Sequence, residues 1–157
     1  MPNKIDAIIH PESIIHGLIE FKDSSIHAFL SQPNMEVSIS SILFDNNIDL
    51  NKHKLDLSSI GSLNFIDIDK DKFKAIELAK NSLDYGGLCP AILNYTNELM
   101  VNFFLKKKIS FTDIVENNKK IFEKFISNNN NIQNPNIDDI SQSFATIDEY
   151  TSRLISN

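Results

Sequence analysis

The sequence is poor in the residues on which several kinds of site depend. It has one cysteine, four glycines and five prolines among its 157 residues. The single cysteine, Cys89, excludes an internal disulfide and a zinc site built from several cysteines. No glycine-rich phosphate loop is present, because the only glycine pair, Gly86-Gly87, stands where a helix is expected to end rather than to begin.

The sequence also lacks a concentration of positive charge and a long apolar run. Its formal net charge is −6, whereas nucleic-acid binding requires a clustered basic face. The densest basic stretch, Lys106-Lys107-Lys108, is placed favourably at the negative end of an expected helix. The residues from Met1 to Asp6 lack the apolar core of a signal peptide, and no run approaches membrane-spanning length. We therefore expect a cytoplasmic protein without nucleic-acid or membrane partners.

The first part of the chain has the pattern of β-strands. Two β-rich runs, Ile14–Phe21 and Ile26–Leu30, are joined by the short turn Asp23–Ser25, which predicts a hairpin. The apolar segments Ile5–Ile9 and Leu63–Ile66 predict two further short strands.

The second part is helical, with apolar residues recurring at helical spacing in four segments. The predicted helices cover Phe73–Leu83, Ile92–Leu105, Ile114–Phe125 and Ile147–Ile155. The first is expected to stop at Gly86-Gly87, where a left-handed backbone costs little. Ser110 and Asp113 match a capping box at the start of the third. The stretch Asn128–Asn136 is predicted to be a loop.

These patterns predict an α+β protein, with a small and mostly antiparallel sheet followed by a C-terminal four-helix bundle. A short helix over Met35–Phe44 and a polar loop over Asp45–Ser59 are expected within the first part. We place the boundary between two domains at residues 1–69 and 70–157. The apolar fraction of 41% is that of a globular protein that can bury a core.

The residues by themselves identify no catalytic centre. The four histidines form no His-Glu-x-x-His pattern or comparable ligand cluster. Asp67, Asp69 and Asp71 match a calcium loop at three positions only, without its glycine and its final glutamate. A nucleophile at Ser13 or Cys89 has no identifiable base. Composition and periodicity therefore predict a fold and no function.

One segment, His10–His16 with the sequence HPESIIH, resembles the HPQSxIHS segment of the 1-deoxy-D-xylulose 5-phosphate reductoisomerase family. Five further segments follow in the family's order and spacing. They are Glu20–Ser25, Pro33–Met35, Leu55–Phe65, Ala91–Glu98 and Ile109–Ile114, which resemble EYxDGS, PDM, LDF…LGxLTF, AxxLNAANE and IxFxDI. The chain is thereby identified as similar to the C-terminal portion of that family.

The resemblance implies an enzyme that rearranges 1-deoxy-D-xylulose 5-phosphate and reduces the product with NADPH. The result is 2-C-methyl-D-erythritol 4-phosphate, in the non-mevalonate pathway of isoprenoid biosynthesis. A divalent metal, Mg²⁺ or Mn²⁺, would stabilise charge on the substrate oxygens. The family's nucleotide-binding fold, metal carboxylates and phosphate-binding residues precede its HPQS segment. The resemblance therefore implies no catalytic, cofactor or metal residue in this chain, and no cofactor bound by the chain alone.

Three residues carry over as substrate-pocket candidates: His16, Pro33 and Met35. His16 would donate a hydrogen bond to substrate or to a carboxylate, or would merely orient its strand neighbours. Pro33 and Met35 would shape the pocket beside substrate and nicotinamide, or would serve ordinary turn and core packing.

Three departures from the family concern the hairpin turn, the pocket loop and the helix packing. Ser24 stands where the family turn has glycine. Glu36-Val37-Ser38 replaces Arg-Thr-Pro beside the pocket loop and reverses a charge. Tyr95 and Thr96 replace two small alanines, so helix packing must differ.

Three interpretations remain open at the level of sequence. The chain is a fragment that is inactive alone, or one half of a split enzyme, or a non-catalytic module that reuses the family's dimerising sheet. The expected partner is accordingly a second copy in a homodimer or the family's N-terminal half.

Overall fold

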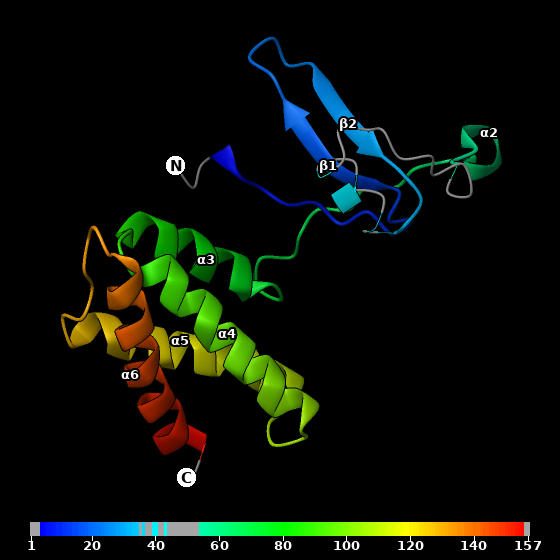
Figure 1. Ribbon diagram of the computed structural model, residues 1–157. Helices are drawn as coiled ribbons and strands as arrows, with labels where there is room; N and C mark the ends of the chain where they lie inside the picture. Colours follow the sequence, from blue (N-terminus) through cyan, green and yellow to red (C-terminus); the bar gives the residue numbers. More distant parts are fainter. Residues whose placement is uncertain (1–3, 35, 37–38, 41–42, 44–53, 156–157) are drawn as a thin grey trace. The chain divides into compact units, whose positions relative to one another are not determined.

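The computed structural model describes residues 4–34, 36, 39–40, 43 and 54–155, and these form two compact units (Figure 1). The hairpin unit comprises Ala7–Ile68, and the helical unit comprises Met1–Asp6 with Asp69–Asn157. The class is α+β, as predicted from the periodicity. The predicted boundary between residues 69 and 70 falls beside the division between the units, and the assignment of separate domains stays a prediction.

The predicted hairpin is confirmed. Strand β1 spans Ile15–Glu20 and strand β2 spans Ile26–Leu30, and the two pair antiparallel. In the turn, Ser24 donates its N–H to the carbonyl of Phe21 at 3.0 Å. Ser24 has a φ of 66°, the left-handed conformation that a glycine adopts most cheaply. Asp23 Oδ1 supports this turn by accepting from the Ser25 N–H at 3.0 Å and from its hydroxyl at 2.7 Å.

The two further strands were predicted wrongly. Of Ile5–Ile9 and Leu63–Ile66, only Ile9 and Ile66 pair, as an isolated antiparallel bridge with N–O distances of 3.0 and 2.9 Å. The pairing does not extend because the chain turns directly after Ile9, where the His10 carbonyl accepts from the Ser13 N–H at 3.1 Å.

The predictions for the segment after the hairpin are tested only in part. Glu36, Ile39, Ser40 and Leu43 are helical, as the short helix over Met35–Phe44 requires, and the remainder of that range lies outside the described residues. The predicted loop Asp45–Ser59 is wrong at its end, since helix α2 covers Leu57–Ile60. Asp56 starts α2 by accepting from the Ser58 N–H at 3.0 Å, an N-cap contact available to any Asp-x-Ser turn.

The helical unit contains the four predicted helices. They are α3 (Lys74–Tyr85), α4 (Cys89–Leu105), α5 (Phe111–Ser127) and α6 (Ile137–Ile155). Helix α4 contacts each of the other three (Figure 1). No helix in the described part of the chain is long and apolar enough to cross a membrane.

Helix starts follow the capping residues. The capping box of Ser110 and Asp113 is confirmed at the start of α5. Helix α6 begins well before the predicted Ile147, because Asn136 and Asp139 form a second reciprocal pair. Asn136 Oδ1 accepts from the Asp139 N–H, and Asp139 Oδ2 accepts from the Asn136 N–H, both at 2.9 Å. This pair satisfies N–H groups that a helix start would otherwise leave free.

The hydrophobic core lies in the helical unit and is built mainly from α4 and α5. Its buried members are Leu88, Cys89, Ile92, Leu93, Met100, Ile114, Ile121, Phe122, Phe125 and Ile147. Tyr95 connects α4 to α6. Its ring stacks on Phe144 with centroids 4.0 Å apart, and its hydroxyl donates to Asp148 at 2.9 Å. Thr96 is fully buried and donates to the Ile92 carbonyl at 2.8 Å.

The Gly86-Gly87 pair ends α3 as predicted, with φ of 64° and 58°, and it also receives the loop before α6. A Cβ built on Gly87 would lie 2.3 Å from the Ile132 carbonyl oxygen. The next residue, Leu88, donates its N–H to Asn131 Oδ1 at 2.9 Å and to the Ile132 carbonyl at 3.1 Å. This close backbone approach requires glycine at position 87.

We predict that Gly87→Ala lowers the free energy of unfolding of the helical unit by about 3 kcal/mol, because left-handed strain and overpacking add. Urea unfolding followed by far-ultraviolet circular dichroism measures the change. Gly17→Ala is the matched control, since a Cβ there meets nothing within 4 Å and the φ lies outside the left-handed region. Equal stability of the two variants would contradict the prediction.

Candidate functional site

His16, the first pocket candidate, lies in a β-bulge. Ile15 pairs with Leu30 and Gly17 pairs with Phe29, so His16 is the extra residue between two regular pairs. A bulge re-aims the side chain of the unpaired residue and is common beside active sites. The bulge was missed at the level of sequence, although an isolated glycine inside a strand pattern, here Gly17, is its usual signal.

The half-buried imidazole of His16 makes one defined hydrogen bond. Its Nε2 lies 3.2 Å from the carbonyl oxygen of Gln32, and a carbonyl only accepts, so Nε2 carries the proton. The ring also lies against Phe29, with centroids 6.4 Å apart. In the neutral ring Nδ1 is therefore an acceptor. The N–H of His16, which was expected to donate to a ligand, donates to the Gln32 backbone carbonyl instead. The neutral ring can therefore only accept a hydrogen bond from a ligand, at Nδ1.

Pro33 follows the residue whose carbonyl holds His16, so the structure brings the first two pocket candidates together. Pro33 is exposed. Gln32 is itself tied down, because its side-chain amide donates to the Lys54 carbonyl at 3.1 Å. The third candidate, Met35, lies outside the described residues. Glu36 donates its N–H to Asn34 Oδ1 at 2.9 Å.

A polar cluster lies just before His16 in the chain. His10 Nδ1 is 2.8 Å from the Asn64 carbonyl and 3.1 Å from Glu12 Oε2. Glu12 accepts from the Asn64 N–H at 3.1 Å and from its side-chain amide at 2.5 Å. The His10 ring stacks on Phe65 with centroids 5.2 Å apart and an interplanar angle of 21°. We call these four residues, His10, Glu12, Asn64 and Phe65, the clamp.

Hydrogen bonds from Asn64 lower the pKa of Glu12 below its ordinary value of 4.5. The side-chain amide of Asn64 is the largest cause, followed by its backbone N–H, and the charge of His10 adds a smaller contribution. These donors favour the ionised carboxylate, whose two oxygens only accept. Because the pKa of Glu12 is lower in the folded chain than in the unfolded chain, its ionised form stabilises the hairpin unit above pH 4.5. This contribution to stability is lost as the pH falls through the lowered pKa.

We predict that acid weakens the contacts of the clamp but not those of the Leu88 amide, which is held by Asn131 and Ile132 without a carboxylate. Amide exchange of Ile9 and Ile66 should accelerate as the pH falls below 4.5, beyond the intrinsic dependence of exchange on pH. Nuclear magnetic resonance measures it, with the Leu88 amide as internal reference. The same acceleration in Glu12→Gln, which has no carboxylate to protonate, would contradict the assignment to Glu12.

The described residues do not fit a metal or a dinucleotide. Within that part of the chain, no group of three or more His, Cys, Asp or Glu side chains could hold a metal ion. The described residues also contain no glycine-rich loop whose N–H groups could bind a phosphate. The Gly86-Gly87 pair ends α3 and packs against the loop before α6. No step of a reaction can be assigned to a bound metal or nicotinamide on these residues.

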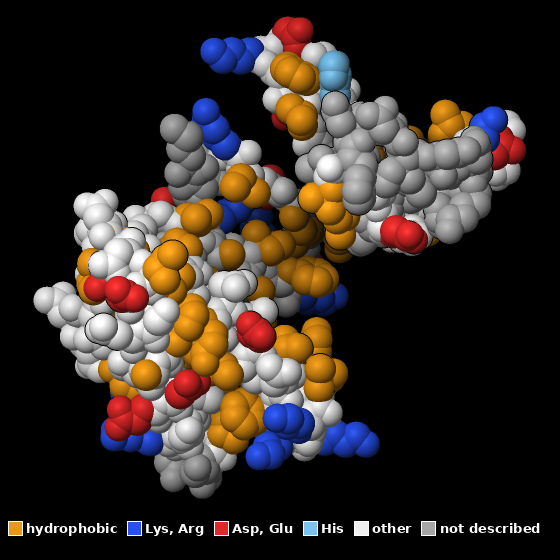
Figure 2. Space-filling view, in the orientation of Figure 1, with side chains coloured by type: hydrophobic (Ala, Val, Ile, Leu, Met, Phe, Trp, Pro, Cys, Tyr) orange, Lys and Arg blue, Asp and Glu red, His pale blue; other side chains and the backbone are white. Residues whose placement is uncertain are grey.

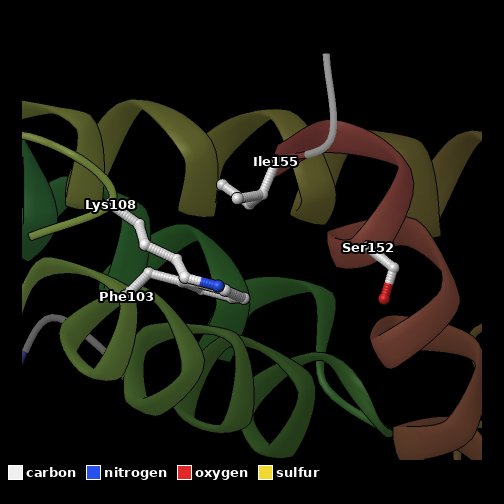
Figure 3. Close-up of a pocket in the computed structure, with 4 residues that line it drawn as sticks. All are labelled: Phe103, Lys108, Ser152 and Ile155. Carbon is white, nitrogen blue, oxygen red and sulfur yellow. The ribbon is translucent and has the colours of Figure 1, made fainter. Parts of the chain in front are cut away.

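A pocket of about 540 Å³ lies in the helical unit. It is lined by Phe103, Lys108, Ser152 and Ile155 (Figure 3). Lys108 lies along the Phe103 ring, with its amine 5.6 Å from the centroid, which is a cation–π contact. The lining offers one cation and one hydroxyl without an acid–base pair, and it includes none of the predicted site residues.

Comparison with known proteins agrees with these features. The family model for the DXP reductoisomerase C-terminal domain matches residues 30–150. The 1-deoxy-D-xylulose 5-phosphate reductoisomerase of a Sulfurihydrogenibium species is 39% identical over 147 residues, which are 93% of this chain and 37% of that protein.

Two solved structures share the fold. The reductoisomerase of Zymomonas mobilis in complex with NADPH superposes with a TM-score of 0.81 at 28% identity, over 96% of this chain and 39% of that one. A DOX-P reductoisomerase in complex with magnesium gives a TM-score of 0.81 at 30% identity, over 95% of this chain and 39% of that one.

The chain spans 37–39% of the length of these relatives, and its match is to their C-terminal domain. The chain belongs to the 1-deoxy-D-xylulose 5-phosphate reductoisomerase family and corresponds to its C-terminal part. The resemblance predicted from the six segments is confirmed.

Proposed function

We propose that this chain supplies the C-terminal part of a 1-deoxy-D-xylulose 5-phosphate reductoisomerase that acts in the cytoplasm and has no turnover alone. In this proposal, the family sequence that precedes the HPQS-type segment supplies the sites for NADPH and for Mg²⁺ or Mn²⁺. The assembly then performs the NADPH-dependent rearrangement and reduction as a homodimer. Residues 1–69 act as the end of the catalytic domain, and residues 70–157 as a helical domain.

The observation that carries the proposal is the set of exposed apolar side chains of the hairpin, some of which are visible near its turn in Figure 2. Five large apolar side chains of the hairpin, on both faces and at its end, are between 41% and 63% exposed. They are Leu18, Ile19, Phe21, Ile26 and Phe29. An antiparallel sheet of a complete domain normally leaves at most one face to solvent, and that face is polar. The exposed side chains therefore favour a partner that covers both faces.

The pocket candidates would contribute binding rather than chemistry. His16 would offer Nδ1 as an acceptor to a hydroxyl or amide of the bound ligands, with its ring held by the Gln32 carbonyl. Pro33 and Met35 would shape the wall beside it. The proposal assigns the chemical steps to the family sequence that precedes the HPQS-type segment.

A non-catalytic interaction module is the second candidate, because the same apolar hairpin would serve any partner that adds strands or a helix to it. The two candidates differ in the partner they require. The first demands the upstream reductoisomerase sequence, and the second does not.

We predict that the chain mixed with the upstream part of the Sulfurihydrogenibium reductoisomerase oxidises NADPH when given 1-deoxy-D-xylulose 5-phosphate and Mn²⁺. Each polypeptide alone should show no loss of absorbance at the nicotinamide band. Turnover should need both polypeptides, because the upstream part supplies the NADPH and metal sites and this chain supplies one wall of the substrate pocket. Turnover by the chain alone, or a stable complex of the two without turnover, would refute the proposal.

His16→Ala should raise the KM of this assembly for the sugar phosphate about tenfold or more, as expected when a hydrogen bond to a charged or polar ligand is lost. The matched control is His27→Ala on β2. The His27 ring contacts Phe21, with centroids 4.7 Å apart, and has no place in the proposed pocket. If both variants change the KM equally, His16 has no specific role.

A further inference from the structure

We propose that Glu12 is a positioning residue, which holds the start of β1 through the clamp and so presents His16 in one orientation. The inference rests on the proposed function only where it concerns the KM for substrate. The structural part of the claim concerns the chain by itself.

The Glu12 carboxylate accepts two hydrogen bonds from Asn64 and forms an ion pair with His10. Oε2 is within hydrogen-bond distance of the Asn64 N–H, at 3.1 Å, and of His10 Nδ1, also at 3.1 Å. Oε1 accepts the Asn64 side-chain amide at 2.5 Å. Because both hydrogen bonds come from residue 64, one side chain joins segments that are 52 residues apart in sequence. Charge-assisted bonds of this kind are stronger than neutral ones.

Of the two ring nitrogens of His10, Nδ1 has polar partners and Nε2 has none among the described residues. The His10 side chain is 6% exposed, and its Nδ1 must donate, since the Asn64 carbonyl only accepts. Its Nε2 is buried without a hydrogen-bond partner among the described residues. The orientation of the ring is therefore set by Asn64, by Glu12 and by the stack on Phe65. Removal of Glu12 takes away the only charged group in that set.

Three residues, 13 to 15, separate Glu12 from His16, and backbone contacts hold each of them. Ser13 has a φ of 54° and donates to the His10 carbonyl at 3.1 Å. Ile14 is 8% exposed, and its carbonyl accepts from the Ser31 N–H at 3.0 Å. Ile15 is paired with Leu30, and the bulge at His16 follows directly. A non-glycine residue in the left-handed region persists only when its surroundings hold it, and the clamp does so on the upstream side.

Glu12→Ala and Glu12→Gln differ in the hydrogen bonds that they leave to Asn64 and His10. Alanine leaves the two donors of Asn64 without an acceptor, while His10 Nδ1 keeps the Asn64 carbonyl at 2.8 Å. Glutamine keeps one oxygen for the Asn64 N–H and for His10, and its amide can donate to Asn64 once the Asn64 amide turns over and presents Oδ1. Glu12→Gln should therefore keep the geometry, whereas Glu12→Ala should not.

The test uses the full chain and two readouts from nuclear magnetic resonance. In Glu12→Ala the Ser31 and Ile66 amides should exchange about tenfold faster or more, as expected when charged hydrogen bonds are lost. The His16 imidazole signals should move towards their positions in the urea-unfolded chain, while those of His27 stay. Glu12→Gln, and the control Glu20→Gln at the far end of β1, should match the wild type.

A donor–acceptor swap between residues 12 and 64 tests the same contact without removing a side chain, in case Glu12→Ala unfolds the hairpin unit. Asn64→Asp places a second carboxylate against Glu12 and should open the clamp. Adding Glu12→Gln should restore the His16 signals, because the glutamine amide then donates to the aspartate. If the double variant stays as displaced as Asn64→Asp, or if Glu12→Ala leaves His16 and Ser31 unchanged, the proposal is overturned.

In the assembled enzyme, Glu12→Ala should raise the KM for the sugar phosphate with little change in kcat, and Glu12→Gln should restore it. An unchanged KM in Glu12→Ala overturns the role in substrate presentation. The magnetic resonance readouts require no turnover, so failure of the assembly to react would count against the proposed function and not against the clamp.

Discussion

A two-stranded hairpin has no interior, and this constraint governs the hairpin unit. Among the described residues, the buried apolar core lies almost wholly in the helical unit, and Ile14 is its one counterpart in the hairpin unit. The hairpin nevertheless carries large apolar side chains on both faces. Two strands are at best marginally stable in water unless further strands or helices pack on them. The relatives, of which this chain spans 37–39% in the examples above, contain the additional sequence that could do so.

In the hairpin unit, polar contacts fix the positions of segments that a hydrophobic core would otherwise hold together. The clamp joins two distant segments, and the Asp23 turn and the Gln32 carbonyl fix the hairpin end and the His16 ring. Such contacts set geometry more than they add stability, because each replaces a hydrogen bond to water. They also make the unit sensitive to acid, since the carboxylates of Glu12 and Asp23 both have lowered pKa values.

Local signals in the sequence predicted what is local in the structure. Apolar spacing and the Ser110 box located the helices, and the Asn136–Asp139 box, which follows the same rule, would have located the start of α6. The strand predictions Ile5–Ile9 and Leu63–Ile66 failed because pairing depends on a distant partner and on the turn at His10. The clamp could not be predicted for the same reason, whereas the bulge had a local signal in Gly17 that the strand prediction overlooked. His16 and Pro33 came from family resemblance, and the structure adds that the Gln32 carbonyl links them.

If the upstream reductoisomerase sequence completes the hairpin, it should protect the backbone amides of β1 and β2. Hydrogen–deuterium exchange of the chain alone and of the mixture with the upstream polypeptide measures this protection. We expect exchange in residues 15–30 to slow about tenfold or more on mixing, while exchange in α4 and α5 stays the same. A complex that forms with unchanged exchange in the hairpin would contradict it.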